Sequence, residues 1–229
     1  MTGTDTGVGK TLVTALLALR FRAHGFDCGV MKPFASGCDE ENGILVSDDV
    51  RFLRDATGVA DDLNLINPVR LAEPLAPLAA ARRAGEASAD YFARARRGFE
   101  QLRRAHETVL VEGVGGLLVP IAERGGQILT CRDLVEEWRL PVVIVARRTL
   151  GTINHTVLTV EALRGRAEVI GLVFCDAAPV PDDDIAAQTS PQIVVELTGV
   201  PILGAVPFLP DVSLTALEQA AERFLRWPL

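Results

Sequence analysis

Short runs of β-branched and other apolar residues alternate along the chain with longer segments in which apolar side chains recur every three to four residues. The short runs are typical of buried strands and the longer segments of amphipathic helices. Five runs are expected to be strands: 28–32, 108–112, 142–146, 169–174 and 202–206. The helices are expected at 10–24, 47–56, 90–105, 131–138, 153–164, 183–197 and 213–225. This alternation predicts an α/β fold, a parallel sheet flanked by helices on both faces.

The beginning of the chain departs from this pattern. Only Met1 and Thr2 precede a glycine-rich loop that starts at Gly3, whereas such a loop normally follows a buried strand of about five residues. We therefore expect either a truncated first strand or a protein start upstream of Met1. A truncated strand would lower the stability of the sheet and loosen the loop that depends on it.

Length and composition predict a single domain over residues 1–229. The chain is 48% hydrophobic and has no linker rich in Pro, Gly or Ser, so it is long enough for one sizeable core. A formal net charge of −7 argues against a nucleic-acid partner, because that affinity depends on clustered Lys and Arg. The Arg-rich segment 94–104 has helical spacing and is expected to be a solvated helix face.

The cysteines and the hydropathy pattern predict a cytoplasmic protein. Cys28, Cys38, Cys131 and Cys175 lie far apart, without a Cys-x-x-Cys pair or a His at metal-ligand spacing. A structural zinc is therefore not expected, and reduced thiols are the simplest account of the cysteines. No secretory signal and no apolar run long enough to cross a membrane is evident, so no membrane partner is expected.

The loop at the start of the chain, residues 3–11, reads Gly-Thr-Asp-Thr-Gly-Val-Gly-Lys-Thr and immediately precedes a helical segment. Backbone N–H groups in such a loop, together with the helix N-terminus, can surround a polyphosphate. Lys10 would add a mobile cation, and the Thr11 hydroxyl could bind Mg²⁺. Five residues separate Gly3 from Gly9, one more than in the usual pattern, and the alternative is a flexible turn before a helix. We expect a phosphate site.

Further candidate residues follow the strands, at the edge where ligands collect in open parallel sheets. Lys32 ends one strand and could neutralise charge on a transferring phosphoryl group, and Ser36 lies on the same loop. Glu112 ends an apolar run and could bind Mg²⁺. The alternatives are a solvated strand end for Lys32 and, for Glu112, a carboxylate that accepts from backbone N–H groups. Asp48 could simply start a helix.

Five segments occur in an order that resembles the dethiobiotin synthetase family. They are the loop 3–11, Lys-Pro-Phe-Ala-Ser-Gly at 32–37, Ala-Glu-Pro-Leu-Ala-Pro at 72–77, Val-Glu-Gly-Val-Gly-Gly at 111–116 and Leu-Gly-Thr-Ile-Asn-His at 150–155. The resemblance runs from Gly3 to about Pro207 and so covers nearly the whole chain. It implies a P-loop NTPase-like fold.

The resemblance also implies an activity and a pathway. In this family ATP and Mg²⁺ drive the carboxylation and ring closure of 7,8-diaminopelargonic acid with CO₂ or bicarbonate. The products are dethiobiotin, ADP and phosphate, and the reaction passes through a carbamate and a carbamic-phosphoric anhydride. The implied role is that of a ligase in biotin biosynthesis, active as a homodimer.

Site residues carry over from the family by position in the matching motifs. The implied Mg²⁺ ligands are Thr11, Asp48 and Glu112, and the implied catalytic residues are Lys10, Lys32 and Thr11. The implied nucleotide contacts are Gly3, Thr4, Asp5, Thr6, Gly7, Val8, Gly9, Lys10, Thr11, Asp48, Glu112, Cys175 and Asp176. The implied substrate contacts are Ser36, Gly115, Leu150, Gly151, Thr152, Ile153 and Asn154, the last five on a loop that reaches across the dimer.

Two positions depart from the family pattern. Gly7 stands where some relatives carry Glu, and glycine also fits the conformation that the loop needs. Cys175 stands where the family often has Asn, whose amide can both donate to and accept from an adenine edge. We therefore expect weaker discrimination between nucleotide bases, with ATP still accepted through its phosphates.

Two other classes of protein remain open from the sequence. One is a nucleotide-switched ATPase of the partitioning or metal-chaperone type, whose loop usually carries an extra lysine near its start. The corresponding stretch 3–7 has no lysine. The other is a catalytically silent homologue that serves as an interaction module. Turnover of a small molecule would distinguish the three.

Overall fold

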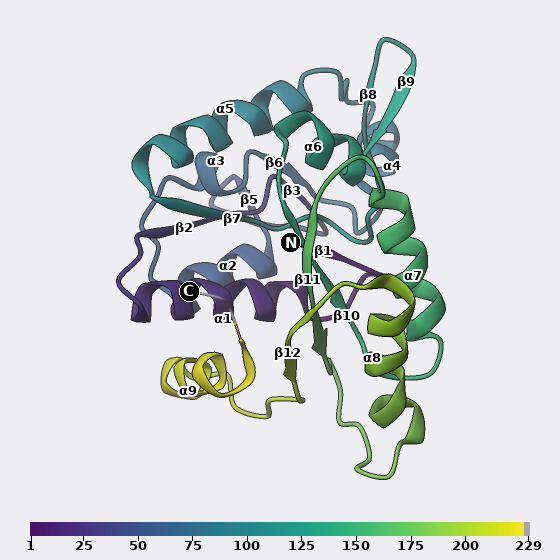
Figure 1. Cartoon of the computed structure of the whole chain (residues 1–229). Coiled ribbons are helices and arrows are strands. Elements are labelled where there is room, and N and C mark those ends of the chain that lie inside the picture. Colours follow the sequence, from purple (N-terminus) through teal and green to yellow (C-terminus); the bar gives the residue numbers. More distant parts are fainter. Residues whose placement is uncertain (227–229) are drawn as a thin grey trace.

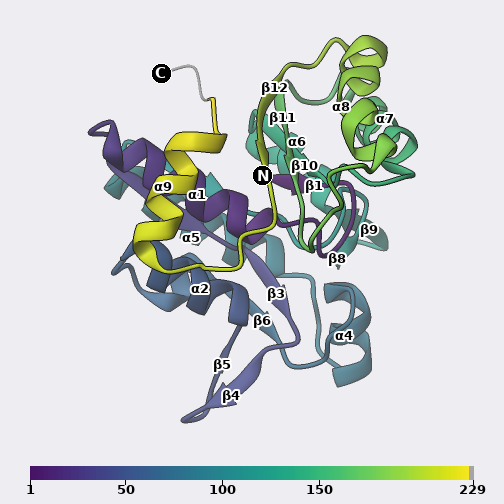
Figure 2. The same cartoon turned by 90° about the horizontal axis from the view of Figure 1, so that it is seen from below.

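A layer of parallel strands runs through the molecule, with helices packed on both of its faces (Figures 1 and 2). The computed structural model describes residues 1–226. The strands of this layer are β1 (Thr2–Gly3), β2 (Cys28–Met31), β7 (Thr108–Val111), β10 (Val142–Ala146), β11 (Val169–Cys175) and β12 (Ile202–Val206). The larger helices are α1 (Lys10–Ala23), α2 (Asp48–Thr57), α5 (Tyr91–Ala105), α6 (Cys131–Trp138), α7 (Thr152–Leu163), α8 (Ile185–Thr198) and α9 (Leu214–Phe224). The α/β prediction is confirmed.

The first strand is short and lies in the middle of the layer. β1 has two residues and pairs with β10, which is followed by β11 and β12, all parallel. On its other side, the Met1 amino group donates to Val111 O at 2.7 Å, and Gly113 N–H donates to Met1 O at 2.9 Å. Because β7 pairs in turn with β2, the strand order is β2-β7-β1-β10-β11-β12. β1 is therefore held on both sides in spite of its two residues.

Alternate residues of the central strands serve two different cores, which is the period expected of strands buried on both faces. Val143, Val145 and Val173 pack with α1, α2 and α9 on one face. Ile144 and Leu172, one residue along, pack with α7 and α8 on the other. α5 lies against β2 and β7 on the face opposite to α1 (Figure 1).

The predicted elements agree with the structure to within two residues at each end. Their ends are chemically marked: Gly58 and Gly199, with φ of 65° and 71°, terminate α2 and α8, and Thr130 and Asp133 form a capping box at the start of α6. The last three residues of the expected domain, 227–229, lie outside the described residues. No helix within residues 1–226 is long and apolar enough to span a membrane.

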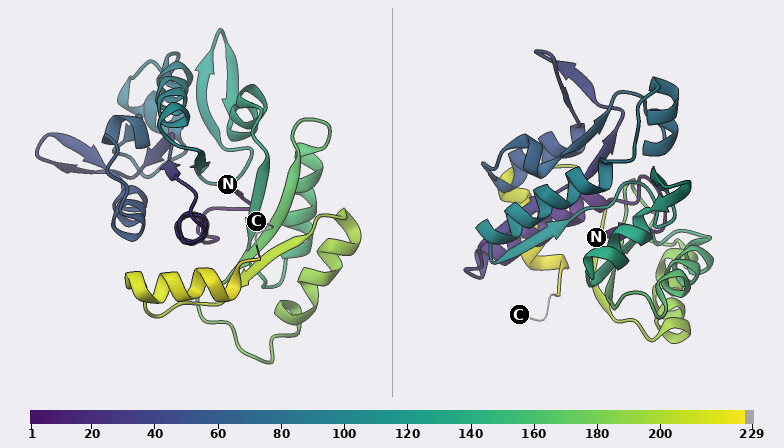
Figure 3. Two further views of the ribbon diagram at one scale, coloured as in Figure 1. Left: turned by 60° about the vertical axis from the view of Figure 1, so that its left-hand side comes forward. Right: turned by 90° about the horizontal axis from the view of Figure 1, so that it is seen from above.

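Several short elements were not predicted. They are β3 (Phe34–Ser36), β4 (Asp39–Glu41), β5 (Ile44–Val46), α3 (Leu63–Ile66), β6 (Val69–Leu71), α4 (Pro77–Ala84), β8 (Pro120–Arg124) and β9 (Gln127–Thr130). The strands among them span three to five residues, too few to establish a period. β4–β5 and β8–β9 form antiparallel hairpins that project from the body of the molecule (Figure 3).

Candidate functional site

The phosphate loop, residues 3–11, connects β1 to α1 and is held from both ends. Thr4 N–H donates to Val145 O at 3.0 Å, and Val8 is fully buried in the core beneath α1. Between these anchors Asp5, Thr6 and Gly7 are exposed. The loop therefore presents its middle residues to solvent at the N-terminus of α1, where backbone N–H groups and the helix dipole favour an anion.

Gly9 and Cys175 lie in direct contact beneath this loop. A Cβ atom added at Gly9 would stand 2.4 Å from Cys175 Sγ, and the Gly9 φ of 87° disfavours any side chain as well. Cys175 is fully buried, and burial raises the pKa of its thiol to about 12. The sequence led us to expect a base contact at Cys175, but the structure places its side chain in the core, where it supports the loop backbone.

Lys10, the first residue of α1, folds back over the loop. Its ammonium donates to Asp5 O at 2.9 Å, and the side chain is largely buried. Burial lowers the pKa of Lys10, and the nearby carboxylate of Glu112 opposes this effect only in part. The amine is thus in a position to donate to a phosphate oxygen bound by the same loop.

Four side chains from four different segments meet beside the loop: α1, the end of β2, α2 and the end of β7. The Thr11 hydroxyl lies 2.8 Å from Glu112 Oε1 and 3.0 Å from Asp49 Oδ1, and its single hydrogen can serve only one of them at a time. Lys32 Nζ donates to Glu112 Oε1 at 2.6 Å and forms an ion pair with Asp49 Oδ2. The side chains of Lys32 and Glu112 are 4% and 0% exposed. We call Thr11, Lys32, Asp49 and Glu112 the acidic-lysine cluster.

Charge pairing dominates the ionisation of this cluster. Burial alone would lower the pKa of Lys32, but Glu112 and Asp49 outweigh it, and the net shift is upward. Burial would raise the pKa of Asp49, and the Lys32 ammonium reverses that effect, so the net shift is downward. Both groups are therefore charged at neutral pH, as a site that neutralises phosphate charge requires.

Asp48 does not join the cluster. Its side chain is 84% exposed and forms an ion pair with Arg51, one turn further along α2. Adjacent helical residues point about 100° apart, so only one of two successive acids at a helix start can face α1. The structure therefore places Asp49, and not Asp48, beside Thr11 and Lys32. The Mg²⁺ role that the resemblance implies for Asp48 stays a prediction.

The donors of the cluster suit a hard divalent cation. Hydroxyl and carboxylate oxygens of Thr11, Asp49 and Glu112 converge, and they are the ligand type that Mg²⁺ prefers. Glu112 Oε2 is buried without a hydrogen-bond partner, so one acceptor remains to be satisfied. No group of three or more His, Cys, Asp or Glu within residues 1–226 could hold a metal ion, so a site here depends on Thr11.

The residues expected to contact substrate occupy two places. Ser36 ends β3 and is half-buried. Gly115 has a φ of 61° and packs beside Thr6 of the phosphate loop. The segment 150–154 starts α7: Leu150 is 90% exposed, whereas Thr152 is buried and its hydroxyl pairs with that of Thr156.

A cavity of about 420 Å³ lies against the phosphate loop. Its walls are Thr4–Thr6, the segment 116–120 and one face of α7, including His155 and Leu158. The segment 117–120 and Leu158 were not predicted as site residues, because apolar residues carry no chemical signature. The volume lies within the range of small-molecule sites.

Asp176 lies at the carboxyl end of the layer, just after β11. Its carboxylate is 2% exposed and is bound by the Arg148 guanidinium, with Nε 3.1 Å from each oxygen. Asp176 N–H donates to Val206 O at 3.0 Å, which fixes the backbone as well. The sequence predicted Asp176 as a nucleotide contact but did not predict its pairing with Arg148.

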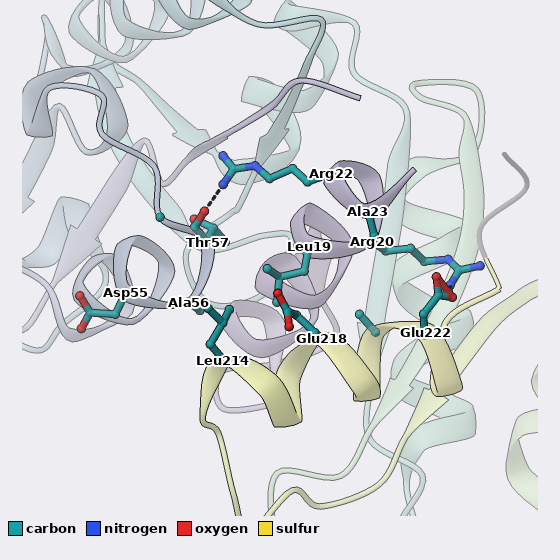
Figure 4. Close-up of a pocket in the computed structure, with 12 residues that line it drawn as sticks. Leu19, Arg20, Arg22, Ala23, Asp55, Ala56, Thr57, Leu214, Glu218 and Glu222 are labelled. Carbon is teal, nitrogen blue, oxygen red and sulfur yellow. Dashed lines mark hydrogen bonds and ion pairs between the residues drawn. The ribbon is translucent and has the colours of Figure 1, made fainter. Parts of the chain in front are cut away.

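The most voluminous cavity described, about 510 Å³, lies away from the acidic-lysine cluster (Figure 4). It is lined by the C-terminal ends of α1 and α2 and by α9, and there Arg22 donates to Thr57 O while Arg20 pairs with Glu222. α1 has 14 residues, so its two ends lie about 20 Å apart at 1.5 Å per residue. Chemistry, not cavity size, therefore identifies the candidate site.

The fold and the phosphate loop define a nucleotide-binding protein of the P-loop NTPase class. Solved structures with the same fold include the MinC:MinD cell division protein complex of Aquifex aeolicus, with a TM-score of 0.53 and 12% identity over 97% of this chain and 93% of that chain. FtsY from Elizabethkingia anophelis, a signal recognition particle receptor, has a TM-score of 0.51 and 14% identity over 96% and 62%. At these identities the likeness concerns the fold alone.

Unlike the structural neighbours, the relatives by sequence share one function. The family model described as an AAA domain (AAA_26) matches residues 1–215. The ATP-dependent dethiobiotin synthetase BioD of Thermodesulfovibrio yellowstonii is 42% identical over 96% of this chain and 92% of its own length. Those of Nitrosopumilus maritimus and Bacillus velezensis are 37% and 38% identical, each over at least 91% of both chains. This chain belongs to the ATP-dependent dethiobiotin synthetase family and is an ATP-using ligase of biotin biosynthesis.

Proposed function

We propose that this chain carboxylates 7,8-diaminopelargonic acid with CO₂ and closes the ring to give dethiobiotin, with ATP and Mg²⁺. The observation that carries the proposal is the acidic-lysine cluster beside the phosphate loop. A site made of a phosphate loop, two lysines and hard oxygen ligands suits a reaction in which the protein positions groups and neutralises charge.

The proposed reaction has three balanced steps. One substrate amine forms an N–C bond to CO₂ and loses a proton, which gives a carbamate. A carbamate oxygen attacks the γ-phosphorus of ATP, and ADP leaves, which gives a carbamic-phosphoric anhydride. The second amine attacks the carbonyl carbon and loses a proton, and phosphate leaves as the ureido ring closes.

Two lysines supply the mobile positive charge. They are the only lysines in the sequence, and both side chains are largely buried at the site. Lys10, on the phosphate loop, is assigned to the ATP phosphates. Lys32, between Asp49 and Glu112, is assigned to the carbamate and the transferring phosphoryl group, where negative charge develops.

Mg²⁺ would be held by Thr11, Asp49 and Glu112. The unpartnered Glu112 Oε2 supports this assignment, because it leaves a buried acceptor for a cation. A bound Mg²⁺ would neutralise charge on the phosphate oxygens of ATP. Asp49 and Glu112 also hold the Lys32 ammonium, so the same carboxylates orient both cations.

We further propose that the site is completed in a homodimer. Leu118, Leu150 and Leu158 border the 420 Å³ cavity or start α7, and they are 55%, 90% and 60% exposed. Apolar side chains gathered beside a cavity are typical of an interface. The segment Leu150, Gly151, Thr152, Ile153 and Asn154 would then reach the partner's substrate, with backbone N–H groups at the start of α7 directed to its carboxylate.

The experiment measures phosphate release with ATP and Mg²⁺, with and without the diamine and bicarbonate, while mass spectrometry follows dethiobiotin. Product should require both substrates and should be lost in Lys10→Ala and Lys32→Ala. Arg51→Ala, a surface cation paired with Asp48, is the matched control and should keep activity. Phosphate release that is indifferent to the diamine would instead support a switch ATPase.

A further inference from the structure

The backbone at Lys32 leaves the sheet at the residue whose side chain carries the charge. At the carboxyl end of β2, Glu112 N–H donates to Met31 O at 2.7 Å, and this is where the hydrogen bonding between β2 and β7 ends. Lys32 N–H instead donates to Ile66 O at 2.8 Å. The next residue is Pro33, which has no N–H. The position of Lys32 therefore depends on a partner outside the β2–β7 ladder.

Asn67 is the partner of the Lys32 carbonyl group. Its side chain is fully buried, and Nδ2 donates to Lys32 O at 2.6 Å and to Val69 O at 3.3 Å. Its Oδ1 is buried without a partner. An unpaired buried acceptor is unfavourable. The amide at this position is thus used for its donor, and its main contact is the backbone of Lys32.

Two arginines hold the backbone at Asn67 and Pro68 in turn. Arg70, on β6, donates to Asn67 O at 2.6 Å, and Arg94, on α5, donates to Pro68 O at 2.7 Å. Asn67 N–H donates to Leu63 O at 2.8 Å at the end of α3. Arg70 also donates to Asn64 Oδ1 at 2.9 Å, and the Arg94 guanidinium lies over the Tyr91 ring, so neighbouring groups hold both guanidiniums in place.

We propose that Asn67 is a positioning residue that, through the Lys32 carbonyl, sets where the Lys32 ammonium stands between Asp49 and Glu112. Arg70 and Arg94 keep the backbone at Asn67 and Pro68 rigid. The chain of contacts runs from α5 and β6, through one side-chain amide, to the buried cation. Its kinetic consequence rests on the proposed function, whereas its structural consequence does not.

The absence of other lysines makes the test direct. Protein labelled with ¹⁵Nζ-lysine has two side-chain signals, one from Lys10 and one from Lys32, and Lys10→Arg assigns them. In Asn67→Ala, and in Asn67→Asp, which keeps the shape but loses the donor at pH 7.5, the Lys32 signal should shift or broaden. The Lys10 signal should stay, because Lys10 is held by Asp5 O.

Kinetics supply the second readout. Asn67→Ala should lower kcat for dethiobiotin formation at least tenfold and change KM for ATP less than threefold, since the phosphate loop is untouched. Gln101→Ala is the control on α5, the helix that carries Arg94: Gln101 is exposed and takes no part in the contacts that hold Asn67. Ser88→Ala controls for lost stability, because it removes a buried contact to Glu123 N–H elsewhere. Both controls should keep the Lys32 signal and kcat.

The outcomes separate the two proposals. A displaced Lys32 signal together with a lower kcat supports the positioning role. A Lys32 signal that stays in place in folded Asn67→Ala overturns it, whatever happens to the rate, and so does a displaced signal with unchanged kcat. If the unaltered chain makes no dethiobiotin, the proposed function fails, and the Lys32 signal alone still decides the positioning role.

Discussion

The Lys32 ammonium donates to Glu112 Oε1 at 2.6 Å, across 80 residues of sequence. The contact follows from strand register: β2 and β7 are parallel neighbours with Met31 opposite Val111, so the next residues of both strands emerge together at the carboxyl edge. Each side chain alone would be a buried charge, which is highly unfavourable. Together, with Asp49 and Thr11, they form a site in which a reacting phosphate can be neutralised.

Glu112→Gln is expected to destabilise the fold and stop turnover. Lys32 would then be buried with Asp49 as its remaining carboxylate, and loss of one partner of a buried pair typically costs about 3 kcal/mol. Urea unfolding would measure the loss. Lys32→Met combined with Glu112→Gln should recover part of the stability, because neither member of the buried ion pair then remains charged without its partner. The double variant should still be inactive, because it lacks the Lys32 ammonium. Full additivity of the two single losses would contradict this coupling.

Asp49→Asn and Asp48→Asn form a matched pair on consecutive residues. Asp49 contacts both Thr11 and Lys32, whereas Asp48 is exposed and pairs with Arg51. We expect Asp49→Asn to raise the Mg²⁺ concentration for half-maximal activity at least tenfold, and Asp48→Asn to change it less than twofold. Titration of activity with MgCl₂ at saturating ATP checks this. Equal effects of the two changes would be incompatible with the proposed Mg²⁺ role of Asp49.

Gly9→Ala should destabilise the protein more than Gly43→Ala, although both glycines have a positive φ that disfavours alanine. At Gly43 the φ is 78° but no atom lies within 4 Å of an added Cβ, whereas at Gly9 the Cβ meets Cys175 Sγ. Gly43→Ala is expected to cost about 1–2 kcal/mol, the left-handed penalty alone. Gly9→Ala should cost more and weaken ATP binding at least tenfold, measured by thermal unfolding and calorimetry. Similar losses of stability for both variants would mean that the Cys175 side chain can move aside without cost, and this would contradict the prediction.

His106 makes stability depend on pH near neutrality. Its ring nitrogens face Asp27 at 2.9 Å and Asp61 at 3.1 Å. Burial would lower the pKa of His106, but these hydrogen bonds outweigh it and raise the pKa above the ordinary value of 6.5. A group whose pKa is higher in the folded state contributes its full stabilisation at pH values below its unfolded-state pKa. The stabilisation is lost as the pH rises through the folded-state pKa.

His106→Gln should therefore lose more stability at pH 5.5 than at pH 9. The ring also packs on Gly29, so a part of the loss that does not depend on pH is expected at both values. Urea unfolding at the two pH values measures the difference. His24→Gln, an exposed histidine at the end of α1, is the control. A loss for His106→Gln that is the same at both pH values would refute the charged pairing.

Base discrimination is expected to be weak. Cys175 stands where the family often has Asn, and its thiol is buried against Gly9, so no side-chain amide from this position reaches a base edge. We expect kcat/KM for CTP or GTP to lie within about tenfold of that for ATP, because a lost hydrogen-bond contact of this kind is worth about 1.4 kcal/mol. Dethiobiotin formation with each nucleotide tests this, and strict dependence on ATP would rule it out.

The regular elements were predictable because their signals are local. The apolar run of β10 and the capping residues of α6 lie within a few positions of one another, so a single pass along the sequence finds them. The same holds for the loop 3–11, whose glycines and Lys10 are contiguous. β3 and β6 were missed because three-residue strands depend on a neighbour for their hydrogen bonds.

Side-chain direction was not predictable. Asp48 and Asp49 are chemically identical neighbours, and only the packing of α2 beside α1 determines which one faces Thr11. Asn67 had no recognisable motif, because its significance lies in contact with the backbone of Lys32, 35 residues away. The Cys175 thiol was expected at the nucleotide, and its burial beneath Gly9 depends on the path of the phosphate loop over β11.

The sequence by itself determined the α/β class, the phosphate loop and the strand ends that carry Lys32 and Glu112. These follow from local periodicity and from the rule that parallel strands present their carboxyl ends at one edge. The tertiary structure alone decided that Asp49 completes the cluster and that Asn67 holds Lys32. Both depend on which faces of distant segments meet in space, and that is fixed by the packing of the whole core, not by neighbours in the chain.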